Sequence, residues 1–317
     1  AGVLQLLCGS AATLLDFARP GDVIAFTGSS GTAKALRAHP NVIEHALRLN
    51  IEADSLNAAV LAPDVDLSSE TGQLFLGDVT RDMTQKTGQK CTAIRRVMVP
   101  SERLDDVAAA LCERLDAIVV GDPSRDDVRM GPVATANQFR DVRAGITRLA
   151  AATDSVRGGT GELAAPRGVD NGKGYFINPV LRSTRDAHNC AALHDHEVFG
   201  PVSTLAAYDG TATDAAALVA RGEGGLVASA YSDDREWTTR FVVDAAAWNG
   251  RLFLGSAKMA AQSPGPGTVL PSLIHGGPGR AGGGEELGGS RGLAFYMQRC
   301  ALEGDATVLK AIVGGAA

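Results

Sequence analysis

The chain has 317 residues, which is enough for about two domains, and its 45% hydrophobic and 21% charged residues are ordinary for a globular protein. Its formal net charge of -6, without a long block of like charge, argues against a general nucleic-acid binder with a basic face. Five widely spaced cysteines without a C-x-x-C pair argue against a disulfide framework and favour a reducing cytoplasm. No apolar run approaches the roughly 20 residues that span a bilayer, so we expect no membrane partner.

The first part of the chain predicts alternating strands and helices. The chain opens without an initiator Met and reaches a strand and glycine turn of α/β type within its first residues, so we expect a fragment whose first part is missing. Residues 101–118 predict an amphipathic helix with Leu104, Val107, Leu111 and Leu115 on one side. Ser68 is expected to cap the preceding helix at 68–86. The expected strands are 21–26 and 95–100, and the expected helices are 32–39, 41–50, 68–86 and 101–118.

The rest of the chain continues the alternation. Strands that alternate with helices of this length indicate βαβ units and a largely parallel sheet. The segment 275–289 (HGGPGRAGGGEELGG) is too rich in glycine for a helix or strand interior, so we expect a loop. The expected strands are 174–182, 201–208, 225–232 and 249–255, and the expected helices are 138–152, 213–222 and 234–248.

Cys91, in KTGQKCTAIRR, is the first candidate for chemistry. Gly88 lets the backbone turn just ahead of it, and Lys90, Arg95 and Arg96 lie close enough in sequence to favour a thiolate. The alternative is a buried, inert thiol, which is the usual state of an isolated cysteine.

Glu52 is the second candidate, because it follows the apolar Leu49 and Ile51 at the end of an expected strand. The alternative is a carboxylate on the surface or at a helix N-cap. A thiolate and a carboxylate together suit one chemistry, in which sulfur adds to a carbonyl and the carboxylate activates the water that cleaves the thioester.

Two further stretches carry weaker signals. FTGSSG (26–31) can place backbone N–H groups against a phosphate at a strand-to-helix turn, although it is not a G-x-G-x-x-G fingerprint. HDHEVFGPV (194–202) offers His194, His196 and Glu197 as metal ligands, but no further ligand group stands at a known spacing. We therefore interpret it as a loop before a strand and predict no metal site.

Five motifs in order resemble the aldehyde dehydrogenase superfamily over nearly the whole chain: FTGSSGTA, NIEADSLN, GQKCTA, GYFINPVL and HEVFGPV. The resemblance implies an α/β aldehyde dehydrogenase fold. It places the C-terminal part of a Rossmann-like NAD(P)-binding domain at 1–52, a largely parallel-sheet catalytic domain at 53–275, and a Gly-rich loop with a C-terminal oligomerisation tail at 276–317.

The resemblance also implies roles for six residues. Cys91 is the nucleophile, whose backbone N–H serves as an oxyanion donor, and Glu52 is the general base. Gly28 and Ser29 line the pyrophosphate end of the cofactor. Glu197 binds the nicotinamide ribose, and Phe199 packs by the nicotinamide.

EADSLN, GQKCTAIRR, the glycine-rich segment and YMQRCALEG resemble the branch that oxidises CoA-linked semialdehydes in aromatic degradation. The expected substrate is 3-oxo-5,6-dehydrosuberyl-CoA semialdehyde of phenylacetate degradation, with 3,4-dehydroadipyl-CoA semialdehyde of benzoate degradation as the alternative. NADP is the implied cofactor, with NAD as the alternative. The resemblance further implies a cytoplasmic homo-oligomer and a hydratase domain after the chain's end. Arg95, Arg96, Arg280 and Lys34 are candidates for the CoA tail.

The sequence departs from the family at Ala33, where a glycine is usual. It also has Ala53, Asp54 and Ser55 in place of the glycine-containing residues that follow the glutamate in the family's E-L-G-G motif. The expected missing part would carry the side-chain oxyanion donor and the lysine that reads the adenosine ribose, so the isolated chain is expected to be inactive.

Two other classes of protein stay open. A non-redox thiol acyltransferase or hydrolase would need a histidine near Cys91, and a non-catalytic assembly module would use the C-terminal tail.

Overall fold

The computed structural model describes residues 2–9, 11, 13–163, 165–170, 172–286 and 288–314. Its centre is a seven-stranded sheet of order β5-β6-β7-β4-β3-β8-β9, in which each neighbouring pair is parallel except β5 and β6. The largely parallel sheet is thus confirmed. Its strands are β3 (Ala58–Leu61), β4 (Arg96–Pro100), β5 (Asp154–Arg157), β6 (Val180–Thr184), β7 (Val202–Tyr208), β8 (Gly225–Tyr231) and β9 (Asn249–Gly255).

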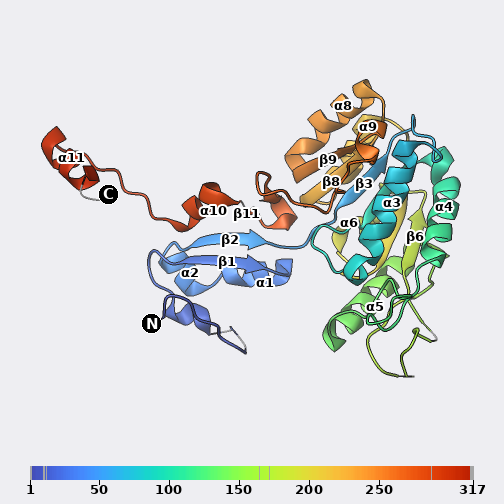
Figure 1. Ribbon diagram of the computed structural model, residues 1–317, viewed down its shortest axis with the longest axis horizontal. Helices are drawn as coiled ribbons and strands as arrows, with labels where there is room; N and C mark the ends of the chain where they lie inside the picture. The colour runs from blue at the N-terminus through green and yellow to red at the C-terminus, as the bar shows by residue number, and fades with distance from the viewer. Residues whose placement is uncertain are drawn as a thin grey trace.

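Helices cover both faces of this sheet (Figure 1). Because side chains alternate along a strand, Ala59 and Leu61 pack under α3 and α4, whereas Ala58 and Val60 pack under α7 and α8. A third cluster joins α5 to the strands β6 and β7. These helices are α3 (Glu70–Thr84), α4 (Leu104–Asp116), α5 (Ala136–Ala150), α6 (Ala191–Asp195), α7 (Ala212–Ala220), α8 (Arg235–Ala245) and α9 (Ala257–Ala260), with 3-10 turns η2 (Gln85–Gly88), η3 (Ser101–Arg103) and η4 (Ala246–Trp248).

A small unit with its own two-stranded parallel sheet precedes the large sheet and lies beside it in Figure 1. Ala33 is buried there against Ile51 and Ala53, so its methyl group fits where the family usually has glycine. The unit consists of η1 (Leu14–Phe17), β1 (Val23–Thr27), α1 (Ser30–Arg37), α2 (Pro40–Glu44) and β2 (Arg48–Glu52).

The C-terminal segment returns to this small unit. The expected loop at 275–289 contains the short antiparallel pair β10 (His275–Gly276) and β11 (Glu285–Glu286), with η5 (Gly279–Ala281) between them. The helices α10 (Gly289–Tyr296) and α11 (Ala306–Gly314) follow and lead away from the large sheet (Figure 1). No described helix has the length and apolar character that crossing a membrane would require.

Three local predictions are wrong. The expected helix at 41–50 ends at Glu44, because residues 48–52 pair with β1 as a strand. The expected strand at 174–182 begins only at Val180, where pairing with β7 starts. Ser69 rather than Ser68 caps α3 by accepting a hydrogen bond from the N–H of Gly72.

Candidate active site

The turn between β1 and α1 opens on a pocket. A Cβ atom on Gly28 would lie 2.5 Å from the ring of Phe26, so a larger residue here would require that ring to move. Ser29 caps α1 by accepting a hydrogen bond from the N–H of Thr32. The carboxylate of Asp54 accepts hydrogen bonds from the N–H of Ser30 at 2.9 Å and from its hydroxyl at 2.5 Å. The turn is therefore tied to the segment that follows β2.

The loop that carries Cys91 is held from two sides. Gly88 has a φ of 68°, and a Cβ atom there would lie 2.2 Å from the carbonyl oxygen of Gly200. On the other side, the Nδ2 of Asn57 donates to the carbonyls of Cys91 at 2.8 Å and Ala93 at 3.0 Å. The backbone is thus fixed, while the sulfur of Cys91 is partly exposed and forms no disulfide among the described residues.

The glycine-rich segment lies along β2. The N–H of Gly284 donates to the carbonyl of Ile51, and the N–H of Ala53 donates to the carbonyl of Ala281, both at 2.9 Å. A Cβ atom on Gly284 would lie 2.4 Å from the oxygen of Ile51, so the close approach depends on glycine. This path brings His275, at the start of β10, beside the end of β2.

His275 connects the two predicted catalytic residues. Its Nε2 lies 2.9 Å from Oε2 of Glu52 and 3.5 Å from Sγ of Cys91. One atom from each of the three side chains lies within 4.8 Å of the others. Hydrogen bonds to Cys91 and then to Glu52 raise the pKa of His275 to about 10, against the opposing effect of burial. The sequence did not place this histidine; its one signal is its position directly before the glycine run.

Glu197 lies in a buried ion pair. Its Oε1 is 3.1 Å from Nε of Arg95, and its Oε2 accepts a hydrogen bond from the N–H of Ser55 at 3.1 Å. Burial raises the pKa of Glu197, and the charge of Arg95 opposes that effect. The Arg95 guanidinium also stands 5.3 Å from the ring centroid of Phe199, so one arginine orients both side chains.

One pocket of about 440 Å³ brings the six predicted site residues together. Gln138 and Arg148 of α5, which the sequence did not suggest, also line it. The residues predicted from sequence that share its wall are Gly28, Ser29, Glu52, Cys91, Glu197 and Phe199.

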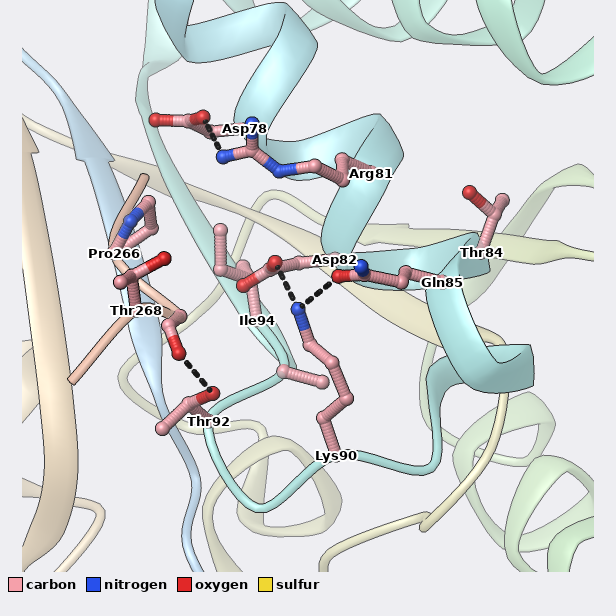
Figure 2. A network of polar contacts seen from close by, with 12 residues as sticks. Asp78, Arg81, Asp82, Thr84, Gln85, Lys90, Thr92, Ile94, Pro266 and Thr268 are labelled. Carbon is pink, nitrogen blue, oxygen red and sulfur yellow. Dashed lines mark hydrogen bonds and ion pairs between the residues drawn. The ribbon is translucent and has the colours of Figure 1, made fainter. Parts of the chain in front are cut away.

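The side chains of the basic residues near Cys91 in sequence pair with other groups, contrary to the expectation that they favour its thiolate. Lys90 extends to the end of α3, where its Nζ binds Oδ1 of Asp82 at 2.7 Å and Oε1 of Gln85 at 2.9 Å (Figure 2). Arg95 is paired with Glu197 as described above. Arg96 is buried and donates to backbone carbonyls, among them those of Leu56, Leu218 and Val219.

The same contacts remove three candidates for the CoA tail. Arg95 and Arg96 are 5% and 2% exposed, so neither presents its charge to a ligand in solution. Arg280 donates to the carbonyls of His194 and Asp195. Lys34 is exposed on α1.

His194 is structural rather than a free ligand. Its Nε2 is 2.9 Å from the carbonyl of Ala187, and its Nδ1 is 3.1 Å from Nη1 of Arg96. Burial lowers the pKa of His194 to about 4, so the ring is neutral at pH 7 and accepts from the arginine.

The sequence profile described as the aldehyde dehydrogenase family matches residues 1–300. The chain belongs to the aldehyde dehydrogenase family. A solved structure of an aldehyde dehydrogenase C mutant from Pseudomonas syringae, in complex with NAD+ and octanal, superposes with a TM-score of 0.71 at 27% sequence identity. The superposed region covers 87% of this chain and 52% of the Pseudomonas chain. The α/β architecture with a mostly parallel sheet is thus the aldehyde dehydrogenase fold.

Two curated proteins are similar in sequence to this chain. A 3,4-dehydroadipyl-CoA semialdehyde dehydrogenase of Aromatoleum evansii is 39% identical over 277 residues, which is 87% of this chain and 53% of that protein. Protein MaoC of Klebsiella aerogenes is 38% identical over 184 residues, which is 58% of this chain and 52% of that protein. The chain spans about half the length of these relatives.

Proposed function

We propose that the protein oxidises a CoA-linked semialdehyde of aromatic degradation to the carboxylic acid, with a nicotinamide dinucleotide as oxidant. The observation that carries this proposal is that Cys91 and Glu52 lie close together in the pocket that Gly28 and Glu197 also line. A nucleophile, a base and a glycine turn around one cavity are what thiol-dependent aldehyde oxidation requires.

We propose this pocket for the dinucleotide. Gly28 and Ser29 of the β1–α1 turn line it, and Ser29 is the N-cap of α1, a position that suits a phosphate group. Oε1 of Gln138 is buried without a partner among the described residues, which suits the hydroxyl of a ribose. When bound, the dinucleotide supplies the hydride acceptor. We propose NADP as the preferred form, with NAD as the alternative to be compared.

Cys91 and Glu52 would carry out different steps of the proposed reaction. The sulfur of Cys91 bonds to the aldehyde carbon, and the backbone N–H of the same residue donates to the oxygen on which negative charge develops. After oxidation the acyl group is a thioester on Cys91. Glu52 then takes a proton from the water that cleaves this thioester.

A second pocket, of about 290 Å³, lies against the Cys91 loop and suits an anionic substrate. Lys90 and Asp82 line it as an ion pair, and Arg81, which also lines it, pairs with Asp78, as Figure 2 shows. The exposed Lys86 lines it as well. We propose this pocket for the substrate side of the site, because arginine and lysine are the usual partners of phosphate and carboxylate groups.

Two CoA-linked semialdehydes of different chain length are candidate substrates. The 39% identity to a 3,4-dehydroadipyl-CoA semialdehyde dehydrogenase supports the benzoate-pathway semialdehyde. The resemblance of the C-terminal motifs supports 3-oxo-5,6-dehydrosuberyl-CoA semialdehyde. Comparing kcat/KM for the two CoA esters in the complete protein decides between them.

Replacing the nucleophile tests the reaction. Cys91→Ala in the complete protein should lower aldehyde-dependent formation of reduced nicotinamide by roughly 10³-fold or more, because the covalent intermediate is lost. Cys300→Ala is the matched control, since this exposed cysteine lies in the C-terminal segment, and it should keep the wild-type rate. Turnover retained in Cys91→Ala would end the proposal.

A thiol acyltransferase or hydrolase is the second candidate, and the 3.5 Å approach of His275 to Cys91 favours it. The geometry differs from a relay triad, however, because Nε2 contacts both Cys91 and Glu52 while Nδ1 has no partner among the described residues. Hydrolysis of a CoA thioester at the rate of aldehyde oxidation, without any dinucleotide, would support this candidate.

A further inference from the structure

The proposed reaction needs two negative charges in a small space. Sγ of Cys91 and a carboxylate oxygen of Glu52 lie within 4.8 Å of each other, and the carboxylate is only 6% exposed. A thiolate and a carboxylate at this separation repel, and burial strengthens the repulsion. The two groups can be ionised together only if a positive charge stands between them.

We propose that His275 is a catalytic residue that takes the thiol proton of Cys91 at Nε2 and then stands as an imidazolium between the thiolate and the carboxylate of Glu52. The step breaks the S–H bond and forms an N–H bond on Nε2, and it needs no oxidant. The inference rests on the proposed function, because it assigns the origin of that reaction's nucleophile.

The contact of one nitrogen with both partners supports this direction of transfer. In the neutral ring that accepts the thiol proton, Nδ1 carries the N–H, and the lone pair of Nε2 faces the oxygen of Glu52 at 2.9 Å, which is an unfavourable contact between two acceptors. Once Nε2 holds the proton, it can donate to the carboxylate and to the sulfur at 3.5 Å. Moving the proton from sulfur to nitrogen therefore turns a repulsive contact into a charge-assisted one.

The other charged groups around His275 are not placed to accept the thiol proton of Cys91. Arg251, on the adjacent β9, donates through Nη2 to the carbonyl of Pro266 and is a fixed cation. Glu286 is the partner of His275 in the β10–β11 register, and its side chain is exposed. Among the described groups near the sulfur, His275 is thus the one that can gain a proton near neutral pH.

The same proton serves later steps. When the sulfur has become part of a thioester, it carries no negative charge. The Nε2–H of His275 then donates its hydrogen bond to Glu52 alone and orients the carboxylate. When water cleaves the thioester, the sulfur leaves as a thiolate beside the imidazolium. The pair is then restored without a further proton transfer to the sulfur.

Alkylation of Cys91 tests the inference without turnover. The second-order rate of iodoacetamide reaction at Cys91, assigned by peptide mass spectrometry, is measured from pH 6 to 9.5 in the complete protein and in His275→Gln. We expect the wild type to react at least about 10-fold faster at pH 6.5, and the two rates to converge above pH 9, where ordinary thiols ionise without help. Superimposable profiles would overturn the proposal.

A second measurement covers the case in which His275→Gln does not fold. The ultraviolet thiolate absorbance of the wild type minus that of Cys91→Ser reports the sulfur's charge directly. A thiolate signal that persists at pH 6.5 supports the imidazolium pair, and its absence there contradicts it. Neither readout uses nicotinamide, so a failed aldehyde assay with a normal thiolate signal would reject the proposed function alone.

Discussion

Gly88 is the residue on which the position of the Cys91 loop depends most directly. Its φ of 68° is left-handed, and any Cβ would meet the carbonyl oxygen of Gly200 at 2.2 Å. Gly88→Ala should therefore destabilise the fold by more than the roughly 1–2 kcal/mol of a left-handed alanine, and it should lower kcat. Urea unfolding and steady-state kinetics measure the two effects.

Gly159 provides the matched control for this prediction. It also has a left-handed φ, 53°, but no atom of the described residues beyond its chain neighbours lies within 4 Å of the place that a Cβ would take. Gly159→Ala should show only the backbone penalty and keep the wild-type kcat. If the two variants lose equal stability and Gly88→Ala keeps full activity, the close approach to Gly200 does not position the loop.

At this scale the sequence predicted residues that local motifs mark. Cys91 and Glu52 end recognisable stretches, and the structure places both in one pocket. His275 could not be placed, because its position depends on how the glycine-rich segment lies along β2. Residue spacing in the sequence does not report this long-range contact. The basic neighbours of Cys91 misled for the same reason, since adjacency in sequence says nothing of where a side chain such as Lys90 ends.

The helix α4 shows what periodicity can predict at the scale of an element. The four residues expected on its apolar side, Leu104, Val107, Leu111 and Leu115, are each 3% exposed or less. Leu111 is fully buried in the core cluster under the large sheet. Leu111→Ala should lower the free energy of unfolding by about 2–5 kcal/mol through lost burial and a residual cavity.

Glu113→Ala, on the exposed side of the same helix, is the control and should change stability by less than about 0.5 kcal/mol. Chemical denaturation monitored by tryptophan fluorescence compares the two variants. A loss below about 1 kcal/mol for Leu111→Ala would show that the α4 core collapses around the missing side chain.

Elements whose state depends on distant pairing were predicted less well. Residues 48–50 have helical spacing, yet they form the start of β2 because β1 offers a parallel partner in register. Residues 174–179 look like a strand, but among the described residues the pairing with β7 starts only at Val180. Local patterns predict amphipathic helices better than they predict where a strand begins, since strand pairing is a long-range property.

At the scale of the whole molecule, the candidate site lies where two units meet. Cys91 belongs to the large sheet's connections, Glu52 ends the small sheet, and the glycine-rich segment crosses between them. The large sheet follows from the alternation of elements in the sequence. The meeting of the units does not, because it depends on backbone contacts such as that between Gly284 and Ile51.

Acid sensitivity of the whole fold is expected from His194, which is 2% exposed and whose pKa burial lowers to about 4. In the unfolded chain the pKa of a histidine is about 6.5, so between these values the unfolded state binds the extra proton and stability falls as pH falls. This residue alone should remove about 3 kcal/mol between pH 7 and pH 4. His194→Gln should flatten that part of the pH profile of unfolding, measured by urea denaturation at each pH. Parallel profiles for wild type and His194→Gln would mean that protonation of the buried ring does not weaken its contact with Arg96.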